Sequence, residues 1–121
     1  MGARQYLAAA LKAAVPKTWD VIEFPTDLEN PRHVTVVIRP TSVKRTKGAP
    51  RMFRDEDFSL ALVEPGLDSA QVETALEASL NILLEILDGI DILVWIDATR
   101  ATYNGRFSGY DITITITTEK G

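Results

Sequence analysis

Residues 58–88 read FSLALVEPGLDSAQVETALEASLNILLEILD, in which a strand pattern runs through a short turn into a helix pattern. The first seven residues are mostly apolar, and Pro65-Gly66 is typical of the end of a strand. Asp68, followed by Gln71 three residues later, predicts the N-cap of a helix. Apolar residues at helical spacing then predict one buried helix face, made of Val72, Leu76, Leu80, Leu83, Leu84 and Leu87.

The segments on either side predict one more helix and four more strands. Residues 2–15 are rich in alanine and carry apolar residues at helical spacing, so they predict a helix that ends before Pro16. Apolar and β-branched runs predict the strands. The four further strands cover residues 19–24, 33–40 (extended through 46), 91–103 and 110–120, and the strand described above covers residues 52–64.

The last two strands differ in pattern. In residues 110–120 one face is apolar and the other is polar, mainly threonine. In residues 91–103 both faces are apolar, with Ile92, Val94 and Ile96 on one side and Leu93 and Trp95 on the other. This second pattern predicts a central strand that is covered on both faces.

The order α-β-β-β-α-β-β predicts a single α+β domain over residues 1–121. We expect a largely antiparallel or mixed sheet with both helices packed on it. The 121 residues are 45% hydrophobic, which is enough for a core without metal ions or disulfides.

Composition limits the classes of function. The chain has no cysteine, which excludes disulfides and thiolate ligands. The net charge of −4 weighs against general nucleic-acid binding. No apolar run approaches the roughly 20 residues of a membrane span, and the N-terminus lacks the apolar core of a signal peptide. We therefore expect a protein made in the cytoplasm that has no membrane association.

Residues with catalytic or metal-binding chemistry do not form a known motif. His33 is the only histidine and has no serine or cysteine motif beside it. Asp91 and Asp97 are predicted on one strand face about 20 Å apart, too far to act as a carboxylate pair. The acids at 55–57 lack the spacing of a calcium loop and are interpreted as a solvated turn.

Residues 105–109 also lack a phosphate-binding signature, and are interpreted as a hairpin turn. We therefore expect no enzyme activity, no metal and no cofactor.

The stretch 43–57, VKRTKGAPRMFRDED, concentrates positive charge in an acidic chain. It predicts a long hairpin arm around residues 41–55, longer than an ordinary connection. It lacks the interleaved aromatic residues with which single-strand binders stack on bases. We therefore interpret it as an assembly arm. Its basic residues are Lys44, Arg45, Lys47, Arg51 and Arg54.

An acidic stripe on the predicted helix is one candidate surface for this arm. Glu73, Glu77, Asn81 and Glu85 recur at four-residue steps, opposite the leucine face. The stripe is either a solvated helix face or a contact for a basic partner. Our hypothesis is that the arm of one copy lies against the acidic surface of a neighbouring copy. Exposed ion pairs would set the register, while buried apolar contacts would supply most of the affinity.

The pattern of segments resembles the tail terminator (tail completion) proteins of long-tailed bacteriophages. The likeness covers nearly the whole chain and is one of pattern rather than of a single motif. It is carried by the N-terminal helix before Pro16, the strand WDVI at 19–22, HVTVVIRPTSV at 33–43 with its arm, residues 58–88, and the closing hairpin through ILVWIDATRATYNGRF and GYDITITITTEK.

The resemblance implies a structural virion protein without catalytic residues. Such subunits form a ring, a hexamer in this family, at the head-proximal end of the tail tube. The ring ends tube polymerisation and offers a surface to head-completion or connector proteins. Genome DNA passes through its centre without sequence-specific binding, and the acidic net charge is compatible with that passage.

Three alternatives remain open at this point. The first is a head–tail connector or other ring-forming neck protein. The second is a small cytoplasmic ligand-binding protein or enzyme, and the third is a nucleic-acid-binding module.

Overall fold

The computed structural model describes residues 2–25, 31–45, 53–66 and 69–119. Within them lie two helices and five strands, in the predicted order α-β-β-β-α-β-β. The elements are α1 (Ala3–Ala14), β1 (Asp20–Ile22), β2 (Thr35–Arg45), β3 (Phe53–Val63), α2 (Ala70–Asp88), β4 (Leu93–Tyr103) and β5 (Phe107–Glu119).

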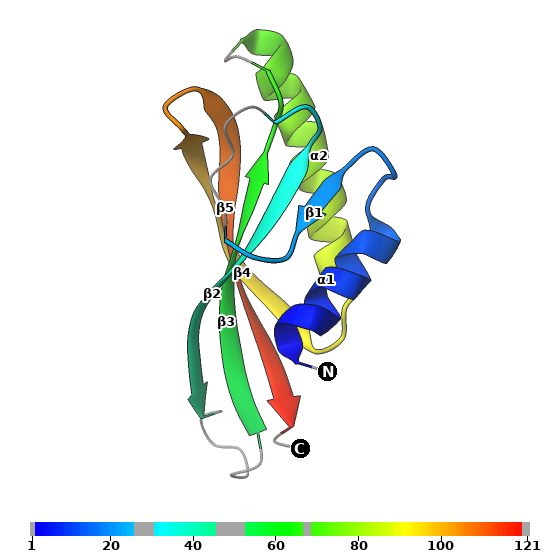
Figure 1. Cartoon of the computed structure of the whole chain (residues 1–121), viewed down its shortest axis with the longest axis vertical. Coiled ribbons are helices and arrows are strands. Elements are labelled where there is room, and N and C mark those ends of the chain that lie inside the picture. Colours follow the sequence, from blue (N-terminus) through cyan, green and yellow to red (C-terminus); the bar gives the residue numbers. More distant parts are fainter. Residues whose placement is uncertain (1, 26–30, 46–52, 67–68, 120–121) are drawn as a thin grey trace.

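The five strands form one mixed sheet in the order β1-β2-β3-β5-β4. The short strand β1 pairs with β2 in parallel, and every other pairing is antiparallel. Both helices lie on the same side of the sheet (Figure 1). We call that side the helix-covered face and the opposite side the far face. The predicted α+β fold with two helices on a mixed sheet is confirmed.

The core lies between the helices and the helix-covered face. Ile112, Ile114 and Ile116 are fully buried there, which confirms the predicted alternation of β5. They meet leucines from β3 and from both helices, among them Leu60, Leu62, Leu7, Leu11, Leu76, Leu83 and Leu87. Each such side chain stabilises the fold by roughly 1.5–3 kcal/mol relative to leaving it in water. Neither described helix is long and apolar enough to cross a membrane.

The N-cap of helix α2 lies one residue later than the sequence predicts. Ser69, not Asp68, is the N-cap, and its hydroxyl accepts a hydrogen bond from the backbone N–H of Val72 at 3.2 Å. Asp68 itself lies outside the described residues. Serine and aspartate are equally good N-caps, so composition alone did not separate the two positions.

The prediction that β4 is a central, covered strand is wrong. β4 lies at the edge of the sheet and pairs only with β5 among the described strands. Ile92, Val94 and Ile96 are 41%, 65% and 59% exposed. Leu93 and Trp95, in contrast, pack against the core. An apolar pattern on both faces indicates two apolar surfaces, but not whether the second is covered within the same chain.

A bulge in β4 also changes the predicted position of two carboxylates. The pairing with β5 shifts between Trp95 and Asp97, and the strand begins only at Leu93. Asp91 therefore precedes the strand, and the even spacing from Asp91 to Asp97 does not define a common face. Asp97 pairs with Thr113 and lies on the far face.

The turn between β4 and β5 is shorter than the hairpin turn predicted at residues 105–109, because β5 begins at Phe107. Asn104 and Gly105 have φ angles of 53° and 66°, left-handed values that asparagine and glycine adopt more readily than other residues. The backbone N–H of Arg106 donates to the carbonyl of Tyr103 at 3.1 Å and closes the turn.

Candidate functional site

The basic stretch lies partly within the sheet. β2 and β3 stay paired as far as Arg45 and Arg54, so the predicted arm is the end of a long hairpin. This end, together with the C-terminal end of β5, extends beyond both helices (Figure 1). The side chain of Lys44 is 63% exposed and forms an ion pair with Asp57 at 3.0 Å. Lys47 and Arg51 lie outside the described residues.

The sequence suggested that the acids after the basic stretch form a solvated turn. That prediction is wrong. All three lie in β3: Asp55 and Asp57 lie opposite threonines of β5, whereas Glu56 lies opposite Ile116 on the helix-covered face. Asp57 accepts hydrogen bonds from Thr115 at 2.8 Å and from Ser42 at 2.7 Å. One step along the sheet, Asp55 accepts a hydrogen bond from Thr117 at 2.8 Å. The threonine face thus supports a ladder of carboxylates on the far face.

This ladder changes the acidity of Asp57. Partial burial opposes ionisation, but hydrogen bonds from Ser42 and Thr115 and the nearby charge of Lys44 outweigh it. Together they hold the pKa of Asp57 below its ordinary value of 3.8. Asp57 is therefore an ionised structural group at neutral pH.

A second polar cluster joins four strands at the other end of the far face. The hydroxyl groups of Tyr103 and Ser59 both donate to Oδ1 of Asp111, at 2.9 and 3.3 Å. The guanidinium of Arg39 lies 5.6 Å from the centre of the Tyr103 ring. Burial and the carboxylate of Asp111 raise the pKa of Tyr103 above its ordinary value of 10. No local motif predicted this cluster, because each residue comes from a different strand.

The acidic stripe of α2 is only partly available to a partner. Glu77, Asn81 and Glu85 are exposed. Glu73 instead forms an ion pair with Arg100 of β4 and accepts a hydrogen bond from Ser108 of β5 at 3.4 Å. This carboxylate therefore fastens α2 to the sheet, and the intact stripe predicted from the sequence is reduced to its C-terminal part.

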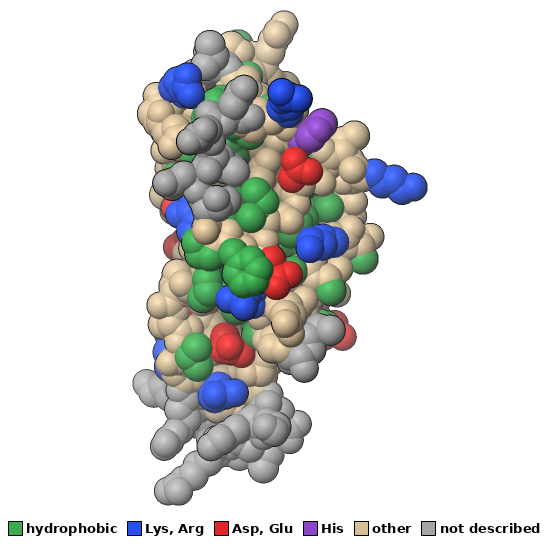
Figure 2. All heavy atoms as spheres, viewed as in Figure 1, with side chains coloured by type: hydrophobic (Ala, Val, Ile, Leu, Met, Phe, Trp, Pro, Cys, Tyr) green, Lys and Arg blue, Asp and Glu red, His purple; other side chains and the backbone are tan. Residues whose placement is uncertain are grey.

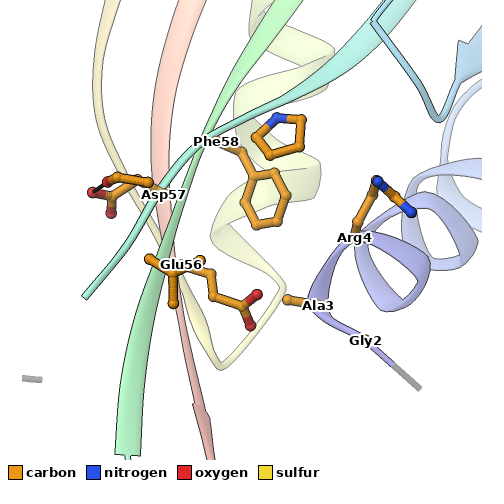
Figure 3. Close-up of a pocket in the computed structure, with 9 residues that line it drawn as sticks. Gly2, Ala3, Arg4, Glu56, Asp57 and Phe58 are labelled. Atoms are coloured by element: carbon orange, nitrogen blue, oxygen red, sulfur yellow. Dashed lines mark hydrogen bonds between the residues drawn. The ribbon is translucent and has the colours of Figure 1, made fainter. Parts of the chain in front are cut away.

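A small hollow of about 230 Å³ opens between the N-terminus of α1 and the hairpin of β2 and β3. Figure 3 shows the side chains of Glu56 and Phe58 pointing toward α1, while the side chain of Asp57 points to the opposite side of β3. Arg4 lies at the rim, with its guanidinium 4.4 Å from the ring of Phe24. The two carboxylates therefore do not converge on the hollow, although both residues belong to its lining together with Arg4, Ser42 and apolar residues.

Charged groups do not gather into a single-sign surface on the face shown in Figure 2. There, Lys and Arg side chains lie singly among acidic and apolar ones. His33 is exposed, and no group of three metal-ligating side chains occurs in the part of the chain that the structure describes. The described residues on the face shown in Figure 2 therefore lack the clustered basic patch that is the usual footprint of nucleic-acid binding.

A scan against protein-family models finds no match, and a search of the curated proteins finds no matching sequence.

Proposed function

We propose that this protein is a ring-forming tail terminator of a long-tailed bacteriophage. The observation that carries the proposal is the presence of two unlike open edges on one sheet. β4 forms one edge and carries exposed aliphatic side chains. The end of β2 forms part of the other edge, carries exposed Lys44 and has no described strand beyond the short pairing with β1.

Unlike edges favour contacts in which one copy's first edge meets the next copy's second edge. Such head-to-tail contacts generate closed rings when the rotation between copies closes. A chain with two like edges would instead favour a two-fold dimer. The sequence resemblance suggests that six copies close the ring.

In the proposed role the ring binds the last ring of tail-tube subunits and ends tube polymerisation. Its opposite surface binds a head-completion or connector protein, and genome DNA passes through the centre. The protein would lie in the neck region of the virion after assembly in the host cytoplasm. The proposal includes no catalysis and no cofactor.

A head–tail connector is the second candidate, because the same unlike edges would serve any ring-forming neck protein. The two proposals differ in the partner that the ring binds. A terminator binds the end of a tail tube, whereas a connector binds a DNA-filled or empty head.

The test is to add the purified protein to tail-tube subunits of the same phage while they polymerise. Electron microscopy then measures tube length and the presence of a cap. A terminator shortens tubes and caps one end in proportion to its concentration. Binding to heads with no effect on tubes would support the connector and contradict the terminator.

A further inference from the structure

The outer edge of β4 is an unsatisfied surface in the isolated chain. Its eleven residues pair on one side only, with β5, among the described strands. An edge of this kind presents a row of backbone N–H and C=O groups that another strand can use. Val94 and Ile96, at 65% and 59% exposure, are the two most exposed large aliphatic side chains of this strand.

The end of β2 is a second unsatisfied edge on the opposite side of the sheet. β1 pairs only with Thr35, Val36 and Val37. From Ser42 to Arg45, beyond the bulge at Pro40, no described strand lies on the outer side. This segment also projects past the helices, so neither of them blocks access to it (Figure 1).

The charges of the two edges are opposite. The exposed charged residues near the start of β4 are all acidic: Asp88, Asp91 and Asp97. β2 contains three basic residues and no acid. Among them, Lys44 lies on the far face, as do Val94 and Asp97. The residues of β5 that are in register with these three alternate with the buried isoleucines, which face the helices.

These charges argue against pairing of β4 with a second β4. A two-fold antiparallel pairing centred on Val94, the most exposed aliphatic residue of this edge, would place Asp91 of one copy opposite Asp97 of the other, and like charges facing each other across strands are destabilising. Pairing with the basic end of β2 places unlike charges together instead.

We propose that β4 of one copy pairs edge to edge with the Ser42–Arg45 segment of the next copy, which continues the sheet from subunit to subunit. In this contact the aliphatic stem of Lys44 covers Val94. The side chain of Lys44 is 63% exposed and ion-paired with Asp57 of its own chain, and its ammonium lies between that carboxylate and Asp97 of the neighbouring copy. The inference rests on the proposed ring and identifies the surfaces that close it. It also moves the acceptor of the basic stretch from the α2 stripe to the edge of β4.

The geometry favours β4 over α2 as the acceptor for two reasons. Glu73 of the stripe is already paired with Arg100. The remaining stripe residues lie on a helix whose backbone hydrogen bonds are made internally, so it offers charge but no open backbone groups. The β4 edge offers charge, aliphatic surface and open backbone groups together.

Single cysteines test this pairing, because the chain has none of its own. Ser42→Cys marks the β2 edge and Val94→Cys marks the β4 edge, and both variants retain Lys44 and Asp97. Asn81→Cys, in the middle of the acidic stripe, is the matched control. Equal amounts of Ser42→Cys and either partner variant are mixed, treated with a short bis-maleimide, and analysed by mass spectrometry.

The pairing predicts that 42–94 heterodimers predominate over 42–81, 94–94 and 42–42 products. A preparation that sediments as a multimer but gives mainly 42–81 or 94–94 products overturns the pairing and leaves the ring standing. A preparation that sediments as a monomer and gives no heterodimer overturns both the pairing and the ring.

Discussion

The hydroxyl of Tyr103 in β4 donates a hydrogen bond to the carboxylate of Asp111 in β5 at 2.9 Å. The two residues are not direct cross-strand partners, since Tyr103 pairs with Phe107 and Asp111 with Thr99. The tyrosine ring therefore reaches diagonally along β5 and lies over Gly109. This contact fixes the hairpin end of β4 to the far face of the sheet.

Removal of that hydroxyl is expected to destabilise the fold. Tyr103→Phe leaves Asp111 with one donor fewer, and a hydrogen bond to a charged group contributes about 1.5–3 kcal/mol. We expect the free energy of unfolding in urea to fall by about 1.5 kcal/mol. Tyr6→Phe, at an exposed position on α1, is the control and should change it little. Equal effects of the two variants on the free energy of unfolding would show that the hydrogen bond from Tyr103 does not stabilise the fold.

The space beneath the ring is the basis of a second prediction. A Cβ atom at Gly109 would lie 2.3 Å from the carbonyl oxygen of Leu62 and 2.5 Å from the Tyr103 ring. The backbone contact cannot be relieved by rotation of a side chain. Gly109→Ala should therefore destabilise the fold by about 3 kcal/mol or more.

Thermal unfolding of Gly109→Ala provides the measurement. Gly2→Ala is the control, because a Cβ there meets no atom within 4 Å, and replacement of this N-cap of α1 by alanine should cost only about 1 kcal/mol or less. A Gly109→Ala protein as stable as the parent would contradict the close packing of Tyr103 on this strand.

Glu64 is expected to make stability depend on pH. It is 5% exposed and accepts a hydrogen bond from Ser79 at 3.1 Å. Burial raises its pKa above the ordinary value of 4.5, although the hydrogen bond from Ser79 partly opposes this shift. The folded state thus holds the proton more tightly than the unfolded state. This contribution is complete below the unfolded pKa and is lost as the pH rises through the folded pKa.

Glu64→Gln removes this dependence while it keeps an oxygen that can accept from Ser79. Relative to the parent, the variant should therefore gain stability as the pH rises from about 4 to about 7. Urea unfolding across that range measures the difference, with Glu85→Gln on the exposed face of α2 as the control. A difference that stays constant with pH would show that Glu64 titrates normally in the folded state.

Charge reversal on the β4 edge should weaken assembly without unfolding the subunit. Asp97→Lys brings a cation against Lys44 of the next copy, and the concentration for half assembly should rise about tenfold. Glu85→Lys makes the same change of charge on α2 and should leave assembly unchanged. Sedimentation measures assembly, and circular dichroism checks the fold. Stronger loss from Glu85→Lys would identify α2 as the contact surface.

The sequence predicted correctly those elements in which the pattern of apolar residues agrees with their packing in the fold. The strand β5 buries the isoleucines that its alternation indicated. Of the six residues predicted for the buried face of α2, three are buried and three are half-buried. The prediction for β4 was wrong because Ile92, just before the strand, and Val94, within it, fit the pattern of a covered strand. Both side chains are exposed at the edge of the sheet. Surfaces that are covered by another chain and surfaces that are covered by the same chain have the same sequence pattern.

The polar contacts were harder to predict for a different reason. Asp55, Asp57 and Asp111 find their partners in strands up to 62 residues away in the chain. Such contacts depend on strand register, which local composition does not determine. The basic stretch was recognised from its residues, but its role as the end of a paired hairpin required the registers of β2 and β3.

The proposed function requires that copies of this chain form a closed ring. Sedimentation velocity of the purified protein over a wide concentration range measures whether they do. The proposal predicts a discrete species whose mass corresponds to about six subunits, as the sequence resemblance suggests, with no continuous series of larger polymers. A monomer or a two-fold dimer at every concentration would contradict it.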